Sequence, residues 1–307
     1  MRKVLFATTA LVALGGVSAA SADIAVTASS SFNYVTTNGG AEAAEDRDIN
    51  TQVDFNLVAS STLDNGMSVM AKMVLDEDAG NQPDDSGMTI SGDFGTLALG
   101  GLASDTLGAM ATDVTADEGS DLHANYIDPA NEHVPHMDMS LALPSISGLS
   151  VIVGVVDGDT ANATEGDRDG TGFGLSYTTT GSMPITVSYA TYSTGEDNSE
   201  VNSVGAKMTA GAATITVAAN ETGNFTGTSV GATYAVSDAL TVQAYTGTGE
   251  DSSVAAYESE LTGIGLTYTI TDGLKMSITQ NDFTGKGDAT AGTQSGSRTA
   301  FALDVAF

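Results

Sequence analysis

The residues best able to do chemistry are concentrated in one stretch of the chain, at about residues 102–136. This stretch contains seven acidic residues, all three histidines and no lysine or arginine. The acidic residues are Asp105, Asp113, Asp117, Glu118, Asp121, Asp128 and Glu132, and the histidines are His123, His133 and His136. Carboxylates without counter-charges attract cations, and a histidine pair can bind zinc. Pro135 breaks any helix that would align His133 with His136, so the sequence favours electrostatic chemistry here over a zinc site.

Smaller acidic groups occur elsewhere in Gly-rich segments. They include the pairs Asp76 and Asp78, Asp157 and Asp159, and Asp167 and Asp169. Grouped carboxylates beside glycine can supply oxygen ligands to Ca²⁺, which accepts about 6–8 of them. Residues 165–170 match the first half of an EF-hand loop, but Ser176 stands where the closing glutamate would be. We therefore expect no required cofactor and keep Ca²⁺ at outer loops as a secondary hypothesis.

Composition excludes several classes of protein. The chain of 307 residues has 39 acidic against 9 basic side chains and no cysteine. Without cysteine, a disulfide scaffold, a zinc ribbon, an iron–sulfur cluster and a thiol enzyme are all excluded. A formal charge of −30 argues against nucleic acid as a partner, because a nucleic-acid binder neutralises phosphates with clustered Lys and Arg.

The first 22 residues have the layout of a secretory signal peptide. Arg2 and Lys3 precede an apolar stretch from Val4 to about Val17, and Ala20-Ser21-Ala22 forms an A-x-A-like cleavage site. We expect cleavage after Ala22 and a single domain over residues 23–307. No later segment has the roughly 18–20 continuous apolar residues of a transmembrane helix.

Alternation of apolar and polar residues predicts about sixteen strands. It is clearest from Ile49 to Ala59, where every second residue is apolar or small and the intervening residues are Asn50, Gln52, Asp54 and Asn56. The predicted strands lie near 24–36, 49–61, 66–76, 87–92, 94–101, 137–143, 149–157, 170–179, 183–193, 201–210, 213–220, 227–236, 239–247, 259–270, 274–283 and 298–307.

The predicted connections alternate strictly between short turns, such as residues 63–66, and long acidic loops, such as 157–169. Such alternation places all short turns on one rim, as in an up-and-down meander. The polar strand faces are mostly Ser, Thr, Asn, Gln and Gly, which suits a confined aqueous lumen, while the apolar faces suit lipid. The pattern therefore predicts an all-β, transmembrane, antiparallel up-and-down β-barrel.

Aromatic and basic residues add detail to this barrel. We expect one aromatic girdle at the long-loop ends, from Tyr34, Tyr192, Tyr245 and Phe283, and another at the short-turn ends, from Tyr177, Tyr234, Tyr268 and Phe307. Strand parity points four basic residues into the lumen, namely Lys72, Lys207, Lys275 and Arg298. Their apolar neighbours, such as Met73 and Met276, would then face lipid.

Three segments resemble the general porins of Gram-negative outer membranes. Residues 92–100 (GDFGTLALG) resemble the hairpin before the long third loop, and residues 143–151 (LPSISGLSV) resemble the turn that follows it. Residues 298–307 (RTAFALDVAF) are similar to the terminal strand of such proteins. Length and composition look similar to the porins of purple non-sulfur bacteria. Gly101 stands where the family commonly has arginine.

The resemblance implies a homotrimeric diffusion channel for small hydrophilic solutes and ions, in contact with outer-membrane lipid and lipopolysaccharide. It also implies that the third loop, about 102–136, folds into the lumen and narrows it. Seven loop acids against four wall bases predict a preference for cations.

Two other functions remain open at this point. A secreted calcium-binding β-rich surface protein or adhesin would fit the acidity, and an outer-membrane barrel hydrolase would fit the fold. No predicted strand carries a histidine, so we expect no enzyme.

Overall fold

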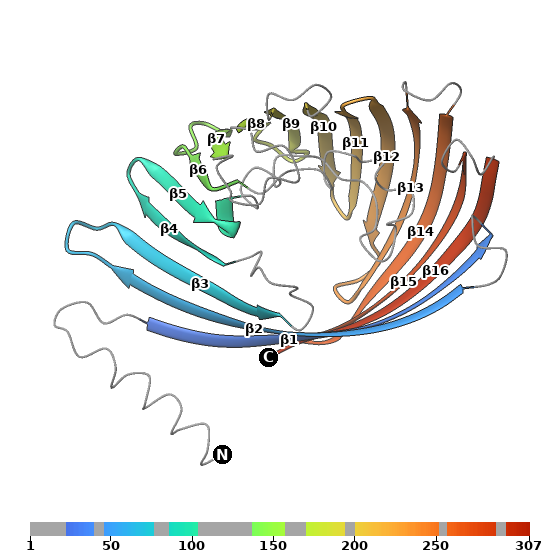
Figure 1. Ribbon diagram of the computed structural model, residues 1–307, viewed down its shortest axis with the longest axis horizontal. Helices are drawn as coiled ribbons and strands as arrows, with labels where there is room; N and C mark the ends of the chain where they lie inside the picture. Colours follow the sequence, from blue (N-terminus) through green and yellow to red (C-terminus); the bar gives the residue numbers. More distant parts are fainter. Residues whose placement is uncertain are drawn as a thin grey trace, which may run out of the picture.

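The protein is a closed β-barrel of sixteen strands (Figure 1). The computed structural model describes residues 23–39, 46–76, 86–103, 137–156, 170–193, 200–251, 257–286 and 293–307. The strands are β1 (Asp23–Gly39), β2 (Asp46–Thr62), β3 (Ser68–Asp76), β4 (Gly87–Gly92), β5 (Gly95–Gly100), β6 (Met139–Ala142), β7 (Leu149–Val156), β8 (Gly170–Thr178), β9 (Ile185–Ser193), β10 (Val201–Ala210), β11 (Ala213–Thr222), β12 (Phe225–Ala235), β13 (Leu240–Asp251), β14 (Tyr257–Thr271), β15 (Leu274–Lys286) and β16 (Thr293–Ala306).

Each strand pairs antiparallel with its neighbours in sequence, and β1 pairs with β16 to close the barrel. The closing ladder runs from Ser29 opposite Ala306 to Gly39 opposite Gly296. Closure satisfies the backbone of both end strands, as spanning a membrane requires. The predicted fold class and strand order are confirmed. Among the described residues, no helix is long and apolar enough to cross a membrane.

Short turns join the strands at the rim where β2 ends and β3 begins. In the turn between β2 and β3, Leu63 N–H donates to Met67 C=O over 2.7 Å, and Gly66 adopts φ +82°, which a side chain would disfavour. The predicted strict alternation of short and long connections is wrong at one place. Only Gly223 and Asn224 join β11 to β12, at the opposite rim. A two-residue connection suffices there because β11 and β12 stay paired as far as Thr222 and Phe225.

Strand parity divides the side chains between two faces. On β12, Gly227, Ser229 and Gly231 are buried, and the intervening Thr228 and Val230 are exposed. The exposed face carries large apolar side chains on many strands, including Ile49, Phe55 and Ile264. It is therefore the convex outer face, and the crowded face of small polar residues is the concave inner wall.

The aromatic residues are distributed differently from the prediction. Tyr177, Tyr234, Tyr268 and Phe307 are exposed near the short-turn rim, as expected for a girdle. At the other rim, however, Tyr192, Tyr245 and Phe283 face inward and are 3%, 4% and 5% exposed, so their assignment to an outer girdle is wrong. The physical reason is their register, because each lies opposite a glycine: Gly172, Gly263 and Gly296, respectively. A ring laid across a glycine fills the space that the missing side chain leaves.

Several strands extend past their predicted ends at the long-loop rim. Strand β14 begins at Tyr257 rather than near 259, and β16 begins at Thr293 rather than near 298. The outer face there carries polar residues such as Glu258, Glu260 and Asp282, so the apolar alternation fades before the pairing does. Backbone hydrogen bonds continue the strands beyond the apolar band.

Candidate functional site: the inner wall of the barrel

The four basic residues predicted to face the lumen all lie on the inner face. Lys207 on β10 is opposite Thr186 and Thr216, and Lys72 on β3 is opposite Val58. Arg298 on β16 lies between Thr37 of β1 and Asn281 of β15. The fourth base is Lys275, which lies opposite Asp304. These positions place the bases on the wall. Their effect on permeation stays a prediction.

The two ends of the acidic segment 102–136 are anchored inside the barrel. Leu102, Ala103 and Met137 are 9%, 0% and 1% exposed, in one apolar cluster with wall residues that include Ile152 and Tyr192. The entering and leaving chains are also tied together, because the N–H of Gly100 donates to the C=O of Asp138 over 2.9 Å. The chain therefore enters and leaves this segment from the inner side of the wall.

The predicted acidic and histidine residues of this segment lie outside the described residues. They are Asp105, Asp113, Asp117, Glu118, Asp121, Asp128, Glu132, His123, His133 and His136. Of the calcium candidates, Asp76 is the last residue of β3. The other five lie outside the described residues, and they are Asp78, Asp157, Asp159, Asp167 and Asp169. Within the part of the chain that the structure describes, no group of three acidic or histidine residues could hold a metal ion.

A second apolar cluster lies on the inner wall across β13, β14 and β15. It consists of Tyr245, Leu261 and Phe283. The hydroxyl of Tyr245 donates a hydrogen bond to the side-chain oxygen of Asn281, which is itself buried. The ring of Tyr245 passes so close to Gly263 that a Cβ there would lie 2.2 Å from Cζ. This close approach is possible because Gly263 has no side chain, and it fixes the position of the tyrosine.

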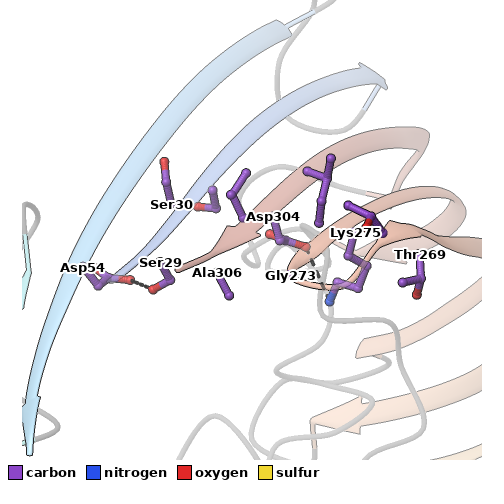
Figure 2. A pocket seen from close by; sticks show the side chains of 12 residues that line it. Ser29, Ser30, Asp54, Thr269, Gly273, Lys275, Asp304 and Ala306 are labelled. Atoms are coloured by element: carbon purple, nitrogen blue, oxygen red, sulfur yellow. Dashed lines mark hydrogen bonds and ion pairs between the residues drawn. The ribbon is translucent and has the colours of Figure 1, made fainter. Parts of the chain in front are cut away.

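Two separate groups of polar side chains flank the junction of β16 and β1, where the barrel closes (Figure 2). On β15 and β16, Lys275 Nζ lies 3.4 Å from Asp304 Oδ2. On β1 and β2, Ser29 Oγ donates to Asp54 Oδ2 over 3.3 Å, and Gln52 Nε2 donates to Asp54 Oδ1 over 3.2 Å. Lys275, Asp304, Ser29 and Asp54 line a hollow of about 420 Å³. We call it the closure hollow.

Sequence reasoning did not single out Asp54 or Asp304. Both occupy inner positions, and Asp54 stands on the polar face of the clearest predicted strand, so parity alone could have identified it as lumen-facing. Its proximity to residues of β15 and β16 depends on the pairing of the first strand with the last. No local pattern reports that pairing.

Comparison with known proteins agrees with this architecture. The anion-selective porin from Comamonas acidovorans superposes with a TM-score of 0.72 at 14% identity, over 93% of this chain and 100% of that chain. A mutant of the Rh. blastica porin gives 0.64 at 19% identity, also over 93% and 100%. OmpT of Vibrio cholerae gives 0.66 at 12% identity, over 95% and 99%. No curated protein matches the sequence. At these identities, the structures establish the fold.

The family follows from the sequence itself. The sequence profile of the Gram-negative porins matches residues 7–299, which is most of the chain. Porins are channels of the outer membrane, and the family is non-enzymatic. With a closed sixteen-stranded barrel and a polar inner wall, the chain belongs to the Gram-negative porin family.

Proposed function

We propose that this porin is a water-filled diffusion channel for small hydrophilic solutes and ions that prefers cations, and that the acidic segment 102–136 forms its constriction. The observation that carries the proposal is the burial of both ends of this segment, at Leu102, Ala103 and Met137, inside the barrel. A sixteen-stranded barrel is wide enough for an aqueous lumen, so the residues that narrow it set its selectivity.

The sign of the selectivity follows from the balance of charges. The segment has seven carboxylates and no base, whereas the wall offers four bases. One of these, Lys275, is paired with Asp304, which weakens its field in the lumen. The Comamonas porin of similar fold is described as anion-selective, so the barrel alone does not fix the sign. The negative excess supports a preference for cations here.

Export and assembly complete the proposal. Residues 1–22 are a signal peptide that is cleaved on export, and the mature chain inserts in the outer membrane as a homotrimer. Carboxylates on the outer face, including Glu221, Glu250 and Glu260, lie beyond the apolar band, where divalent cations could bridge them to lipopolysaccharide. The channel needs no cofactor. No described residue favours the adhesin or the hydrolase.

Reversal potentials across a planar bilayer with a KCl gradient test the selectivity. The variant with Asp117→Asn and Glu118→Gln removes two charges from the proposed constriction, so its reversal potential should move toward zero. The wild-type preference should also weaken as KCl rises from 0.1 to 1 M, because the screening length falls from about 10 to about 3 Å.

Glu221→Gln serves as the matched control, because it removes a carboxylate that faces outward from β11. It should leave the reversal potential unchanged. If the double variant also behaves like the wild type, neither Asp117 nor Glu118 contributes to the constriction.

A further inference from the structure

The closure hollow is lined by polar side chains of the barrel wall that are not part of the proposed constriction. It lies on the wall formed by β14, β15, β16, β1 and β2, and Ser29, Asp54, Thr269, Lys275 and Asp304 are among its lining residues (Figure 2). Its volume of about 420 Å³ is within the range of small-molecule sites, about 300–1,000 Å³. A solute in the lumen can reach these groups, since the side chains of Lys275 and Asp304 are 50% and 34% exposed.

The charges in the hollow are not equivalent. Lys275 and Asp304 are 3.4 Å apart and largely cancel each other's charge. Asp54 accepts hydrogen bonds from two neutral groups, the Ser29 hydroxyl and the Gln52 amide. These bonds hold the Asp54 carboxylate in place without neutralising it. Each of its oxygens has a second lone pair, so Asp54 can accept from a further donor.

The remaining groups add hydrogen-bonding capacity on the opposite side of the hollow from Asp54 (Figure 2). Thr269 and Thr271 of β14 present hydroxyls that are exposed to water, and a hydroxyl both donates and accepts. The Lys275 ammonium has three donors and its side chain is 50% exposed, so it can donate to a solute. The hollow therefore offers one uncompensated carboxylate on one side, and donors and acceptors suited to hydroxyl groups on the other.

We propose that the closure hollow is a solute subsite for small polyhydroxylated molecules that carry a protonated amine. The amine binds Asp54, and the hydroxyls of the solute bind the Ser29 and Ser31 hydroxyls of the adjacent β1 and, farther across the hollow, the Lys275–Asp304 pair. This inference depends on the proposed function, because a solute reaches the hollow only through an open lumen. It adds a step that a nonspecific pore lacks, in which solutes of equal size are retained according to charge.

Three probes of one ring type separate the contributions of charge and size: glucosamine, which is protonated, N-acetylglucosamine, which is neutral, and glucuronate, which is anionic. Single-channel current in KCl is recorded with each probe. Glucosamine should cause interruptions whose frequency saturates with concentration, and the other two probes should not. Asp54→Asn should weaken the apparent affinity for glucosamine about tenfold, as expected for the loss of one charge-assisted hydrogen bond.

Neighbouring variants give effects of opposite sign, which misfolding would not produce. Asp304→Asn leaves the Lys275 cation uncompensated and should weaken glucosamine binding, whereas Lys275→Gln frees the Asp304 carboxylate and should strengthen it. Asp48→Asn is the matched control, because it removes an inner-face carboxylate from the same strand, six residues from Asp54. It should leave the affinity unchanged.

Two failures are distinguishable. A folded barrel that carries no KCl current refutes the proposed function. A conducting barrel overturns the subsite alone if glucosamine and N-acetylglucosamine act equally, or if Asp54→Asn and Asp48→Asn have the same effect.

Discussion

At Gly263, one added methyl group should disrupt the packing of the inner wall. In Gly263→Ala, the new Cβ would lie 2.2 Å from Tyr245 Cζ and 2.3 Å from Asn281 Oδ1. Carbon atoms in contact are normally about 3.5–4 Å apart, so the ring must move by more than about 1 Å. That movement breaks the hydrogen bond from the Tyr245 hydroxyl to Asn281.

The expected cost follows from three contributions. Overpacking of this kind costs about 1–3 kcal/mol. Loss of the Tyr245–Asn281 hydrogen bond costs about 0.5–1.5 kcal/mol. Alanine also restricts the unfolded chain, which returns about 0.4–1 kcal/mol. The net loss in the free energy of unfolding should therefore be centred on about 2 kcal/mol.

Gly265→Ala is the matched control, on the same strand and the same face. Its Cβ would meet the side chain of Gln243, with Nε2 at 2.6 Å and Cγ at 2.8 Å. Gln243 is half-buried and flexible, so it can rotate into the lumen. We expect its cost to stay below about 1 kcal/mol.

Urea titrations of the barrel in lipid vesicles measure both variants. The folded fraction is read from gel mobility without heating, because the chain has no tryptophan for fluorescence. Adding Tyr245→Ala removes the clash, so the double variant with Gly263→Ala should lose less than the sum of the single variants. Strict additivity, or a cost no larger than that of Gly265→Ala, would refute the packing argument.

Two further predictions concern single inner-wall groups. Tyr192→Phe should leave the urea midpoint unchanged or raise it slightly, because the buried Tyr192 hydroxyl has no hydrogen-bond partner among the described residues, whereas Tyr245→Phe should lower stability by about 0.5–1.5 kcal/mol. Equal shifts in the two variants would contradict this. Lys207→Met removes a positive charge from the inner face of β10, so the cation-to-anion permeability ratio measured by reversal potential should rise, and an unchanged ratio would show that Lys207 does not act on the ion path.

The barrel itself could be predicted from sequence, because the residues of its membrane-facing side are apolar and alternate with polar residues along each strand. Residues 49–59 show the period of two directly, and β2 spans them in the structure. The same signal disappears where strands rise above the apolar band. Strand β14 begins at Tyr257 and includes Glu258, which the apolar pattern leaves outside the predicted strand of residues 259–270.

Residue type alone was misleading for the inner aromatics. On β13, the even-numbered residues Leu240, Val242 and Ala244 face outward. By the same alternation, the odd-numbered Tyr245 is expected to face inward. Tyrosine near a strand end nevertheless favoured an interface position. The glycine that accepts its ring is on the next strand, so only the inter-strand register reveals the packing.

The residues of the candidate site were predictable to different degrees. The inward orientation of Lys72, Lys207 and Lys275 could be predicted from parity, because each has an apolar neighbour that faces outward, and Arg298 follows the alternation of its strand. The closure hollow could not be predicted in this way. It is lined by residues of the first two strands and the last three, and the sequence separation between those two sets of strands is most of the chain.

The sequence separation between the first and the last strand also determines when the barrel can close. Until β16 has been delivered across the inner membrane, β1 lacks its second pairing partner, and Lys275 and Asp54 cannot line one hollow. A chain interrupted during export would leave two unpaired strands in hydrocarbon, which is prohibitive for their peptide groups. Completion of the ring and creation of the closure hollow are therefore one event, and the lumen is enclosed on all sides only when this event has taken place.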